Sequence, residues 1–592
     1  NGIDKPLYRY ATYGGNIGGR FVRDKAFFFY NYEKWDVETP LSARQNTVPT
    51  GPERLGDFSQ SFDTGGNLLV ITDPLTGSPF PGNKIPSDRI NSNGFALLDH
   101  FPMPNFPANS GGNYNYQFGR TQNAPRLNNV ARVDLRPTQN DSVYSRFSVW
   151  HHPSTSIQGG VGVDHSFTYD DYAFSENYTR VIGNNAVNEF SFGYRHSREW
   201  NPWADSFDIT NIQRDTAGYT LGQFNSAINP FNLIPEMSFG GMIPNAAGLG
   251  YDSRFINFGN DDIFTVNNAL SVTAGRHNLK MGFYYENLTN IEGRGASSFA
   301  GTYDFARDVF NPGETGHPYA NALTGNFRSY SENSARLGQR ASHQIFNAFI
   351  QDKWQPTAKL TFDLGLRFST YTYYNQEAGR LGDGTMSGGE SASFVQSRWD
   401  PAMAPQLYAP VMSNGNRMSR NPVTGAIGPA MLIGAMVEGS GNFANGMVHD
   451  VDPNYPENFM DPVGLLLEPR IGLAYDVAGD GRTALRVNFG IFHNATQAGA
   501  LSWRQALNPP HVYTPTIYYG NMSTLLQTSG VTFPSNPVYT VVRENRPPEM
   551  TNFQIGIQHE LGLGTVLDAA FVATRGKNLP QMRNINTIPQ GA

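Results

Sequence analysis

The chain has 592 residues, a net charge of −7 and no cysteine, and it contains no run of about 18 apolar residues. These totals exclude transmembrane helices, disulfides and thiol chemistry, and the negative charge gives no reason to expect a nucleic-acid partner. Phenylalanine (40), tyrosine (29) and glycine (62) are abundant. Charged residues make up 16% of the chain, below the ~25% usual in globular proteins. This composition is typical of a protein made of strands and turns.

Seven β-hairpins are predicted in chain order, because runs of aromatic and β-branched residues are joined by short connections of Gly, Asn, Asp and Pro. Their strands are expected at 10–21 and 26–35, 127–136 and 142–152, 172–181 and 186–200, 262–273 and 277–288, 344–355 and 359–374, 469–477 and 483–492, and 552–561 and 565–574. Many of them are about 9–12 residues long, which suits a tilted strand crossing a bilayer. The fold class is therefore all-β: an antiparallel transmembrane β-barrel.

The strand KLTFDLGLRF (359–368) alternates apolar and polar residues, and successive strand side chains point to opposite faces. In an outer-membrane barrel the apolar face meets lipid and the polar face lines a lumen, whereas in a soluble sandwich the apolar face meets a protein core. We favour the barrel. The candidates for the lipid face are Leu360, Phe362, Leu364, Leu366, Phe368, Leu485, Val487, Phe489 and Ile491.

Charged residues on the alternate positions of the strands are the candidates for the lumen. They are Arg132, Asp134, Arg136, Glu189, Arg195, Lys280, Glu286, Asp363, Arg367 and Arg486. They can pair with one another across strands, and they can also form a polar wall that packs a plug and conducts solute. The two interpretations are compatible.

Tight turns alternate with long irregular segments, at 39–126, 153–171, 201–261, 291–344, 375–467 and 494–550. This alternation is typical of outer-membrane barrels, with periplasmic turns on one rim and extracellular loops on the other. Aromatic residues near strand ends suit the girdles found at the membrane interfaces. They are Trp35, Trp150, Trp200, Trp354, Tyr371, Tyr373 and Tyr374.

Other motifs favour structural explanations. The segment GGNIGG (14–19) lies within a strand pattern with no helix after it, so we interpret its glycines as easing strand curvature. His151 and His152 lack a spaced third ligand. The acidic segment 449–458 does not have EF-hand spacing, and Asp-Gly in 476–482 marks a turn. We expect no cofactor and no metal, and because no catalytic constellation can be placed, no enzyme.

Several segments resemble TonB-dependent outer-membrane receptors of the Oar-like branch, common in Acidobacteria. They include YGGNIGGRFVRDKAFFFYNYEKW, TVPTGPERLGDFSQ, NAFIQDKWQPTAKLTFDLGLRF and EPRIGLAYDVAGDGRTALRVNFGIF. The hairpin at 345–368 is specific to the superfamily, and the loop at 47–105 is specific to the branch. Arg20 and Phe21 stand where Pro-Ile is more usual.

The resemblance implies active transport across the outer membrane, in which the TonB complex pulls on a plug. Residues 1–592 are then a partial barrel domain of about 14 strands out of ~22, and a signal peptide, a regulatory-like domain and the plug are expected outside it. The solute is a siderophore, cobalamin, a glycan or a peptide. Two alternatives stay open: a structural or adhesion barrel that displays large loops, and a soluble all-β protein acting on polysaccharide.

Overall fold

The structure is a computed structural model. It describes residues 8–585 with these exceptions: 107–112, 159–162, 205–206, 253–256, 294–296, 375–379, 382–385, 389–390, 450–451, 457–458, 496–503, 529 and 535–536.

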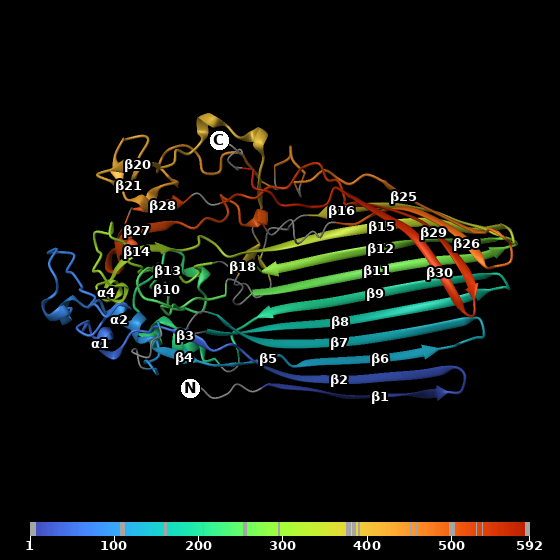
Figure 1. Cartoon of the computed structure of the whole chain (residues 1–592), viewed down its shortest axis with the longest axis horizontal. Helices are drawn as coiled ribbons and strands as arrows, with labels where there is room; N and C mark the ends of the chain where they lie inside the picture. Colours follow the sequence, from blue (N-terminus) through green and yellow to red (C-terminus); the bar gives the residue numbers. More distant parts are fainter. Residues whose placement is uncertain are drawn as a thin grey trace.

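One antiparallel sheet dominates the fold, and its long strands follow one another in chain order (Figure 1). Its first seven strands are β1 (Arg9–Val22), β2 (Ala26–Pro40), β6 (Arg126–Leu135), β7 (Asp141–Gln158), β8 (Val163–Ile182), β9 (Ala186–Asn201) and β11 (Asn257–Ala274). The next seven are β12 (His277–Gly293), β15 (Leu337–Thr357), β16 (Leu360–Tyr374), β25 (Leu466–Asp476), β26 (Thr483–His493), β29 (Glu549–Gly562) and β30 (Thr565–Lys577). The predicted all-β antiparallel fold and its strand order are confirmed.

All the tight turns lie at one end of this sheet, which we call the turn end, and the long segments lie at the other, the loop end (Figure 1). Most of the strands are longer than predicted, and β15 has 21 residues, whereas β6 keeps its predicted length of 10 residues. The predicted long loop at 153–171 is wrong. Its residues continue the hairpin of β7 and β8, in which Pro153 lies opposite Thr168 and Gln158 opposite Val163.

The glycines of 14–19 lie within β1, as predicted, and one of them has a steric reason. A Cβ added to Gly14 would lie 2.3 Å from the carbonyl oxygen of Tyr32 on the neighbouring strand. The close approach of β1 to β2 at this point therefore requires glycine.

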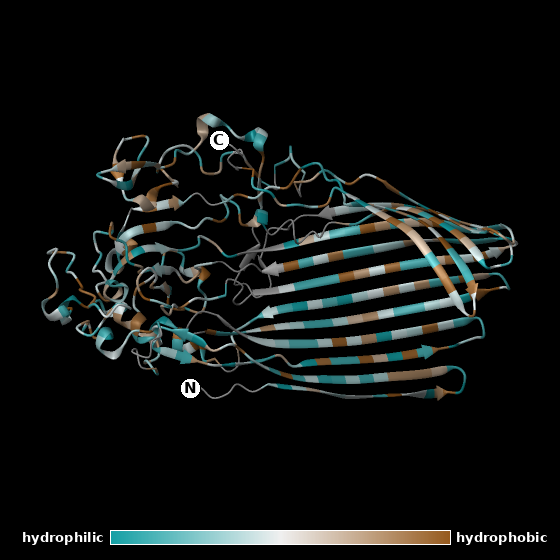
Figure 2. Cartoon of the chain, viewed as in Figure 1, coloured by the Kyte–Doolittle hydropathy of each residue, from teal (hydrophilic) through white to brown (hydrophobic). Residues whose placement is uncertain are grey.

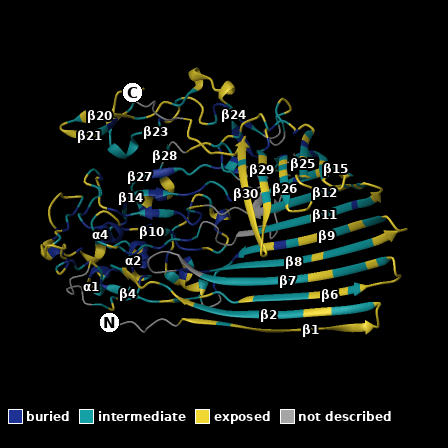
Figure 3. Ribbon diagram, turned by 45° about the vertical axis from the view of Figure 1, so that its right-hand side comes forward, coloured by how far each residue is buried: buried dark blue, intermediate teal, exposed yellow. Residues whose placement is uncertain are grey.

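The segments at the loop end fold together into one domain, which we call the cap. Its core gathers side chains mainly from four separate segments, with Leu97, Ile212, Phe327 and Leu525 as examples. Buried residues concentrate in the cap, whereas the strands of the main sheet are mostly exposed or half-buried (Figure 3). The segments are therefore parts of a packed unit, because they bury apolar surface against one another.

A six-stranded sheet in the order β10-β13-β14-β27-β28-β23 supports the cap. Its strands are β10 (Glu236–Ser238), β13 (Thr302–Asp304), β14 (Asn326–Ser331), β27 (Thr516–Asn521), β28 (Val531–Pro534) and β23 (Ala435–Met436). Short helices accompany it, among them α1 (Gly51–Arg54), α2 (Ser92–Asp99), α3 (Arg214–Ala217) and α4 (Pro318–Leu323).

Short strands complete the loop end. They are β3 (Arg44–Asn46), β4 (Tyr116–Phe118), β5 (Thr121–Asn123), β17 (Arg380–Leu381), β18 (Met386–Gly388), β19 (Ala392–Phe394), β20 (Ala409–Ser413), β21 (Asn416–Arg420), β22 (Ile427–Gly428) and β24 (Met447–His449). Of these, β20, β21 and β22 form a separate three-stranded sheet at the top of the cap in Figure 1.

Candidate functional site

Apolar residues form a continuous face across neighbouring strands of the main sheet. Leu364 on β16 lies opposite Ile471, which lies opposite Phe489, which lies opposite Phe553 on β29. This face, the apolar face, carries all the candidates predicted to share it: Leu360, Phe362, Leu364, Leu366, Phe368, Leu485, Val487, Phe489 and Ile491. The hydropathy bands along the strands in Figure 2 follow the same alternation.

The opposite face, the polar face, carries the charged candidates on its strands. Asp363 lies opposite Gly472, which lies opposite Asn488 and then Gln554. The register of the other strands places nine predicted charged residues on this face: Arg132, Asp134, Glu189, Arg195, Lys280, Glu286, Asp363, Arg367 and Arg486. The predicted segregation of the two sets is therefore a feature of the sheet.

Several of these charges are paired. Arg132 contacts Asp134 at 2.6 Å on its own strand. The Lys280 ammonium lies 3.8 Å from the Glu189 carboxylate, although β11 separates their strands. Asp363 accepts a hydrogen bond of 2.7 Å from the Gln351 amide. Of these contacts, the one between Lys280 and Glu189 is a charge pair that crosses strands, whereas Arg132 and Asp134 pair along one strand.

Two further charges engage partners that the sequence did not suggest. Arg195 forms an ion pair with Asp171 on β8. Glu286 lies 3.4 Å from the ring of His343 on β15. Both partners lie in segments that were predicted to be long loops, 153–171 and 291–344. They were therefore not considered as strand residues that could pair with a charge on the polar face.

The other arginines among the predicted lumen residues lie beside uncharged groups. Arg136 follows the last residue of β6, and its guanidinium lies 6.0 Å from the centre of the Phe27 ring. Arg367 lies 5.9 Å from the Phe349 ring. Arg486 lies opposite Ala474 and Gly556 in the register of its neighbours.

The predicted aromatic girdle is wrong for three residues. Trp35 and Trp150 contact each other edge to face at 5.5 Å, and both lie on the polar face. Tyr371 also lies on the polar face and is 5% exposed. Trp200 and Trp354 lie on the apolar face, as expected. The side chains of Tyr373 and Tyr374 lie outside the described residues.

A buried ionisable cluster at the loop end of the sheet was not predicted. The Glu468 carboxylate accepts a hydrogen bond of 3.0 Å from the Ser369 hydroxyl and lies 3.8 Å from Arg470. His493 stands between two carboxylates, 3.5 Å from Glu468 and 3.7 Å from Glu549. In the sequence, the cluster could have been recognised from Glu468, which directly precedes Pro469 and Arg470 at the start of a strand.

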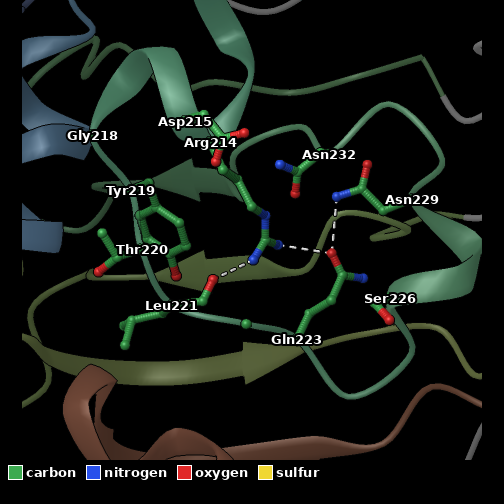
Figure 4. A pocket seen from close by; sticks show the side chains of 11 residues that line it. Arg214, Asp215, Gly218, Tyr219, Thr220, Leu221, Gln223, Ser226, Asn229 and Asn232 are labelled. Carbon is green, nitrogen blue, oxygen red and sulfur yellow. Dashed lines mark hydrogen bonds between the residues drawn. The ribbon is translucent and has the colours of Figure 1, made fainter.

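The cap contains a cavity of about 530 Å³ in the segment between β9 and β11 (Figure 4). Arg214 is buried in its wall and donates hydrogen bonds to the carbonyl oxygens of Leu233 and Leu221 and to the Gln223 amide oxygen, the last at 2.7 Å. Asn229 donates to the same amide oxygen at 2.9 Å. The guanidinium therefore fixes the shape of the wall, because its donors are used within it.

The residues considered as metal ligands in the sequence have the following surroundings in the structure. His151 contacts the Asp170 carboxylate on β8, and in the described part of the chain no group of three or more potential ligands is placed to hold a metal ion. The predicted acidic segment 449–458 lies partly outside the described residues, and its Asp452 accepts a hydrogen bond from Asn454. The turn at 476–482 is confirmed, since Asp476 accepts bonds from the amides of Gly479 and Gly481.

Among the helices of the described residues, none has the length and apolar character needed to cross a membrane.

The strand order, the two-faced sheet and the loop-end cap define an outer-membrane barrel protein. The chain belongs to the family described as "Outer membrane beta barrel domain", which matches residues 1–592. Its location is the outer membrane, which contradicts the alternative of a soluble polysaccharide-acting protein. No curated protein is significantly similar to the chain.

Solved structures that match the chain include the outer membrane transporter YddB of Escherichia coli, at 7% identity and a TM-score of 0.46, covering 95% of this chain and 46% of that one. The ferric-catecholate import receptor Fiu of Escherichia coli K12 has 10% identity and a TM-score of 0.41, with 99% and 60% covered. The alcaligin outer membrane receptor FauA of Bordetella pertussis has 10% identity and a TM-score of 0.36, with 99% and 55% covered. The chain thus spans about half the length of these relatives.

Proposed function

We propose that the chain is the barrel portion of a TonB-dependent active transporter, of the Oar-like branch, that imports a solute across the outer membrane. The observation that carries the proposal is the segregation of the sheet into an apolar and a charged face. In this proposal the apolar face meets lipid, and the polar face, with its pairs such as Lys280 and Glu189, lines the lumen. In this proposal the polar face serves the passage of the solute and has no role in catalysis.

The proposal also includes parts of the transporter that lie outside this chain. A barrel of ~22 strands is the size that holds a plug, so about eight strands, one before and about seven after the 14 long strands of this chain, and a plug are expected outside it. The periplasmic TonB complex acts on the plug region, and the partners of this chain itself are lipid and the solute. The turn end lies on the periplasmic side and the cap lies outside the cell.

The second candidate function is display of the cap for adhesion, and the folded core of the cap favours it. A transporter needs a plug and TonB, whereas a display barrel needs neither. The discriminating experiment uses the complete protein in its native outer membrane. The membranes are solubilised, and co-purification of the periplasmic domain of TonB is measured with and without in-cell crosslinking.

Transport predicts that TonB co-purifies with the complete protein and that removing the plug region abolishes this. Absence of TonB from the purified protein, together with a complete reading frame lacking plug-encoding sequence, would favour adhesion and contradict the transporter. The control is an outer-membrane barrel of the same host without a plug, which should not retain TonB under the same conditions.

A further inference from the structure

Glu176 on β8 lies on the apolar face, near the middle of the band that the proposed function assigns to lipid. The register of neighbouring strands connects Leu364 to Ile182 on β8 through Asp352, Leu279, Val272 and Ala186. Glu176 is six residues from Ile182, the end of β8, and an even separation keeps the same face. On a strand tilted by ~45°, this places it about 14 Å from the turn end, within a band ~25 Å tall.

The carboxylate of Glu176 has few hydrogen bonds for such a position. Among the described residues, its one side-chain donor is the hydroxyl of Ser145 on β7. An ionised carboxylate has sites for about four donors. Charged side chains on the lipid face destabilise a barrel, and ionisable residues at this depth are normally paired. We therefore expect a further donor to Glu176 from outside the chain.

Asn268 on β11 carries a suitable donor on the same face and at the same depth. It is six residues from Ala274, the end of β11. Asn268 and Asn188 exchange hydrogen bonds of 3.0 and 3.2 Å between their side-chain amides. Each amide has two N–H donors, so one donor of Asn268 stays available. Because β9 lies between β8 and β11, Asn268 is two strand spacings from Glu176, about 10 Å, and cannot reach it within one chain.

Phe192 on β9 lies midway between these two polar groups. It is six residues from Ala186, the start of β9, and lies opposite Glu176 in the register. Its ring centre is 6.1 Å from that of Phe174 on β8 and 5.3 Å from that of Phe264 on β11. Phe174 and Phe264 are 38% and 37% exposed. A hydrogen-bond acceptor and a donor therefore flank an aromatic strip at equal distances from its central strand.

We call Glu176, Phe192, Asn268, Phe174 and Phe264 the β9 seam, and we propose that two copies of this protein pair through it in the outer membrane. A two-fold axis along the membrane normal keeps every residue at its own depth. With the axis at Phe192, Glu176 meets the partner's Asn268, and the same contact forms again on the other side of the axis, as a self-complementary interface requires. The carboxylate gains an amide donor, and the rings of the two copies pack together.

This inference goes beyond the proposed function. It rests on the assignment of the apolar face to lipid and does not depend on transport. Three adjacent strands are a suitable width for the contact, because two convex barrels touch only along a narrow strip. The predicted lipid-facing residues of β16 and β26 are all apolar, so those strands provide a control surface without an acceptor and a donor at matching depths.

The test is disulfide crosslinking in outer membranes that contain the complete protein at its natural level. Residues 1–592 contain no cysteine, and any cysteine elsewhere in the protein is replaced by serine. Phe192→Cys lies at the proposed axis, where two copies approach closely enough for a disulfide. The control Phe489→Cys has the same residue type, face and depth, since Phe489 is six residues from Thr483, the start of β26. With copper phenanthroline as the oxidant, Phe192→Cys should form about tenfold more homodimer than the control.

A pair of substitutions tests the hydrogen bonds of the seam in the Phe192→Cys protein. Asn268→Asp sets a carboxylate against Glu176 on both sides of the axis and should lower the crosslinked fraction about tenfold. Adding Glu176→Gln exchanges the acceptor and the donor and should restore crosslinking. Only folded, heat-modifiable barrel is counted. Should Phe192→Cys fail to fold, native mass spectrometry of the unchanged protein decides between a dimer, as proposed, and a monomer.

Three results would overturn the proposal. They are a homodimer yield of Phe192→Cys no higher than that of Phe489→Cys, crosslinking of Phe192→Cys to a different protein, and failure of Glu176→Gln to restore the dimer of Asn268→Asp. The outcome is separable from that of the transporter proposal. A dimer that does not retain TonB would contradict transport and leave the seam standing, whereas a monomer that retains TonB would contradict the seam alone.

Discussion

Asp363 and Leu364 are neighbours in the chain and have opposite surroundings. The Asp363 carboxylate accepts a hydrogen bond of 2.7 Å from Gln351 on the polar face. The Leu364 side chain is 41% exposed on the apolar face, opposite Ile471. In the proposed barrel the Asp363 side chain contacts water and the Leu364 side chain contacts lipid. Substitutions at these two positions therefore test the assignment of the two faces.

A cation on the apolar face should prevent assembly of the barrel. Leu364→Arg in the complete protein should cost ~2–4 kcal/mol, the value for a cation near the bilayer midplane. The control Asp363→Asn removes a charge from the polar face and should leave assembly nearly intact. The measurement is the fraction of heat-modifiable, folded barrel in outer membranes. Equal loss of folded barrel in both variants would contradict the assignment of faces.

Larger apolar residues distinguish lipid from a protein core. Leu364→Trp and Leu366→Phe should be tolerated, because lipid adapts to the added volume. In a close-packed core each would cost ~1–3 kcal/mol through overpacking. The same heat-modifiability measurement applies. Unfolding of both variants would show that the apolar face packs against protein.

The core of the cap should be sensitive to truncation of its aromatic residues. Phe327→Ala should destabilise the cap by ~3–5 kcal/mol, because Phe327 is fully buried among other rings. Phe62→Ala is the control, since Phe62 is 51% exposed. Unfolding of the cap is followed by trypsin cleavage at Arg54 and Arg214, which are buried in the folded cap. Identical cleavage rates in the two variants would contradict a single packed core.

Trypsin added to intact cells should cut the exposed sheet of β20, β21 and β22 first. Arg417 and Arg420 are exposed there, and protease cleavage concentrates at exposed loop tips. Arg23 and Lys25 in the turn between β1 and β2 are also exposed in the chain, but they should be protected by the membrane. Cleavage at the turn with β20–β22 intact would reverse the proposed orientation. Peptide mapping by mass spectrometry identifies the sites.

Acid should weaken the cap through His317. Burial lowers the pKa of this histidine to about 4, and its Nδ1 accepts a hydrogen bond from the Tyr319 amide at the start of α4. The folded state prefers the neutral ring, so its contribution is fully present above the unfolded pKa of ~6.5 and falls as the pH drops toward about 4. The loss over this window is on the order of 3 kcal/mol.

The check is thermal unfolding of the cap, followed by protease protection, between pH 7 and pH 4. His317→Asn keeps a side chain that can cap the helix and does not titrate. The variant should show a flatter dependence on pH over this window. A pH dependence as steep as that of the unchanged protein would assign the acid sensitivity to another group.

The main sheet could be predicted because strand alternation is a local signal: KLTFDLGLRF alone separates its two faces. The cap could not be predicted, because Leu97, Ile212, Phe327 and Leu525 come from segments far apart in the sequence and meet only in the folded core. The contact of Tyr519 with Asp308 could not be predicted for the same reason, since the two residues meet only in the folded cap.

The extended hairpin of β7 and β8 was not predicted, because the segment 153–171, which begins at Pro153, was predicted to be a long loop. The pairing of β7 with β6 ends at His151, opposite Leu127. Beyond that residue β7 pairs only with β8, so Pro153 occupies an edge position where its missing amide hydrogen costs no ladder bond. Sequence alone gives no information on where the neighbouring strand stops.

The most direct test of the central claim is the solvent that each residue of β16 contacts. The chain has no cysteine, so single cysteines can be placed at 361, 362, 363, 364, 365 and 366 in the complete protein. Each variant is labelled in outer-membrane vesicles with a water-soluble maleimide and, separately, with a lipophilic one. We predict that 361, 363 and 365 react with the water-soluble reagent and that 362, 364 and 366 react only with the lipophilic one. Labelling of 362, 364 and 366 by the water-soluble reagent, or equal labelling at all six positions, would contradict a sheet with lipid on one face and a lumen on the other.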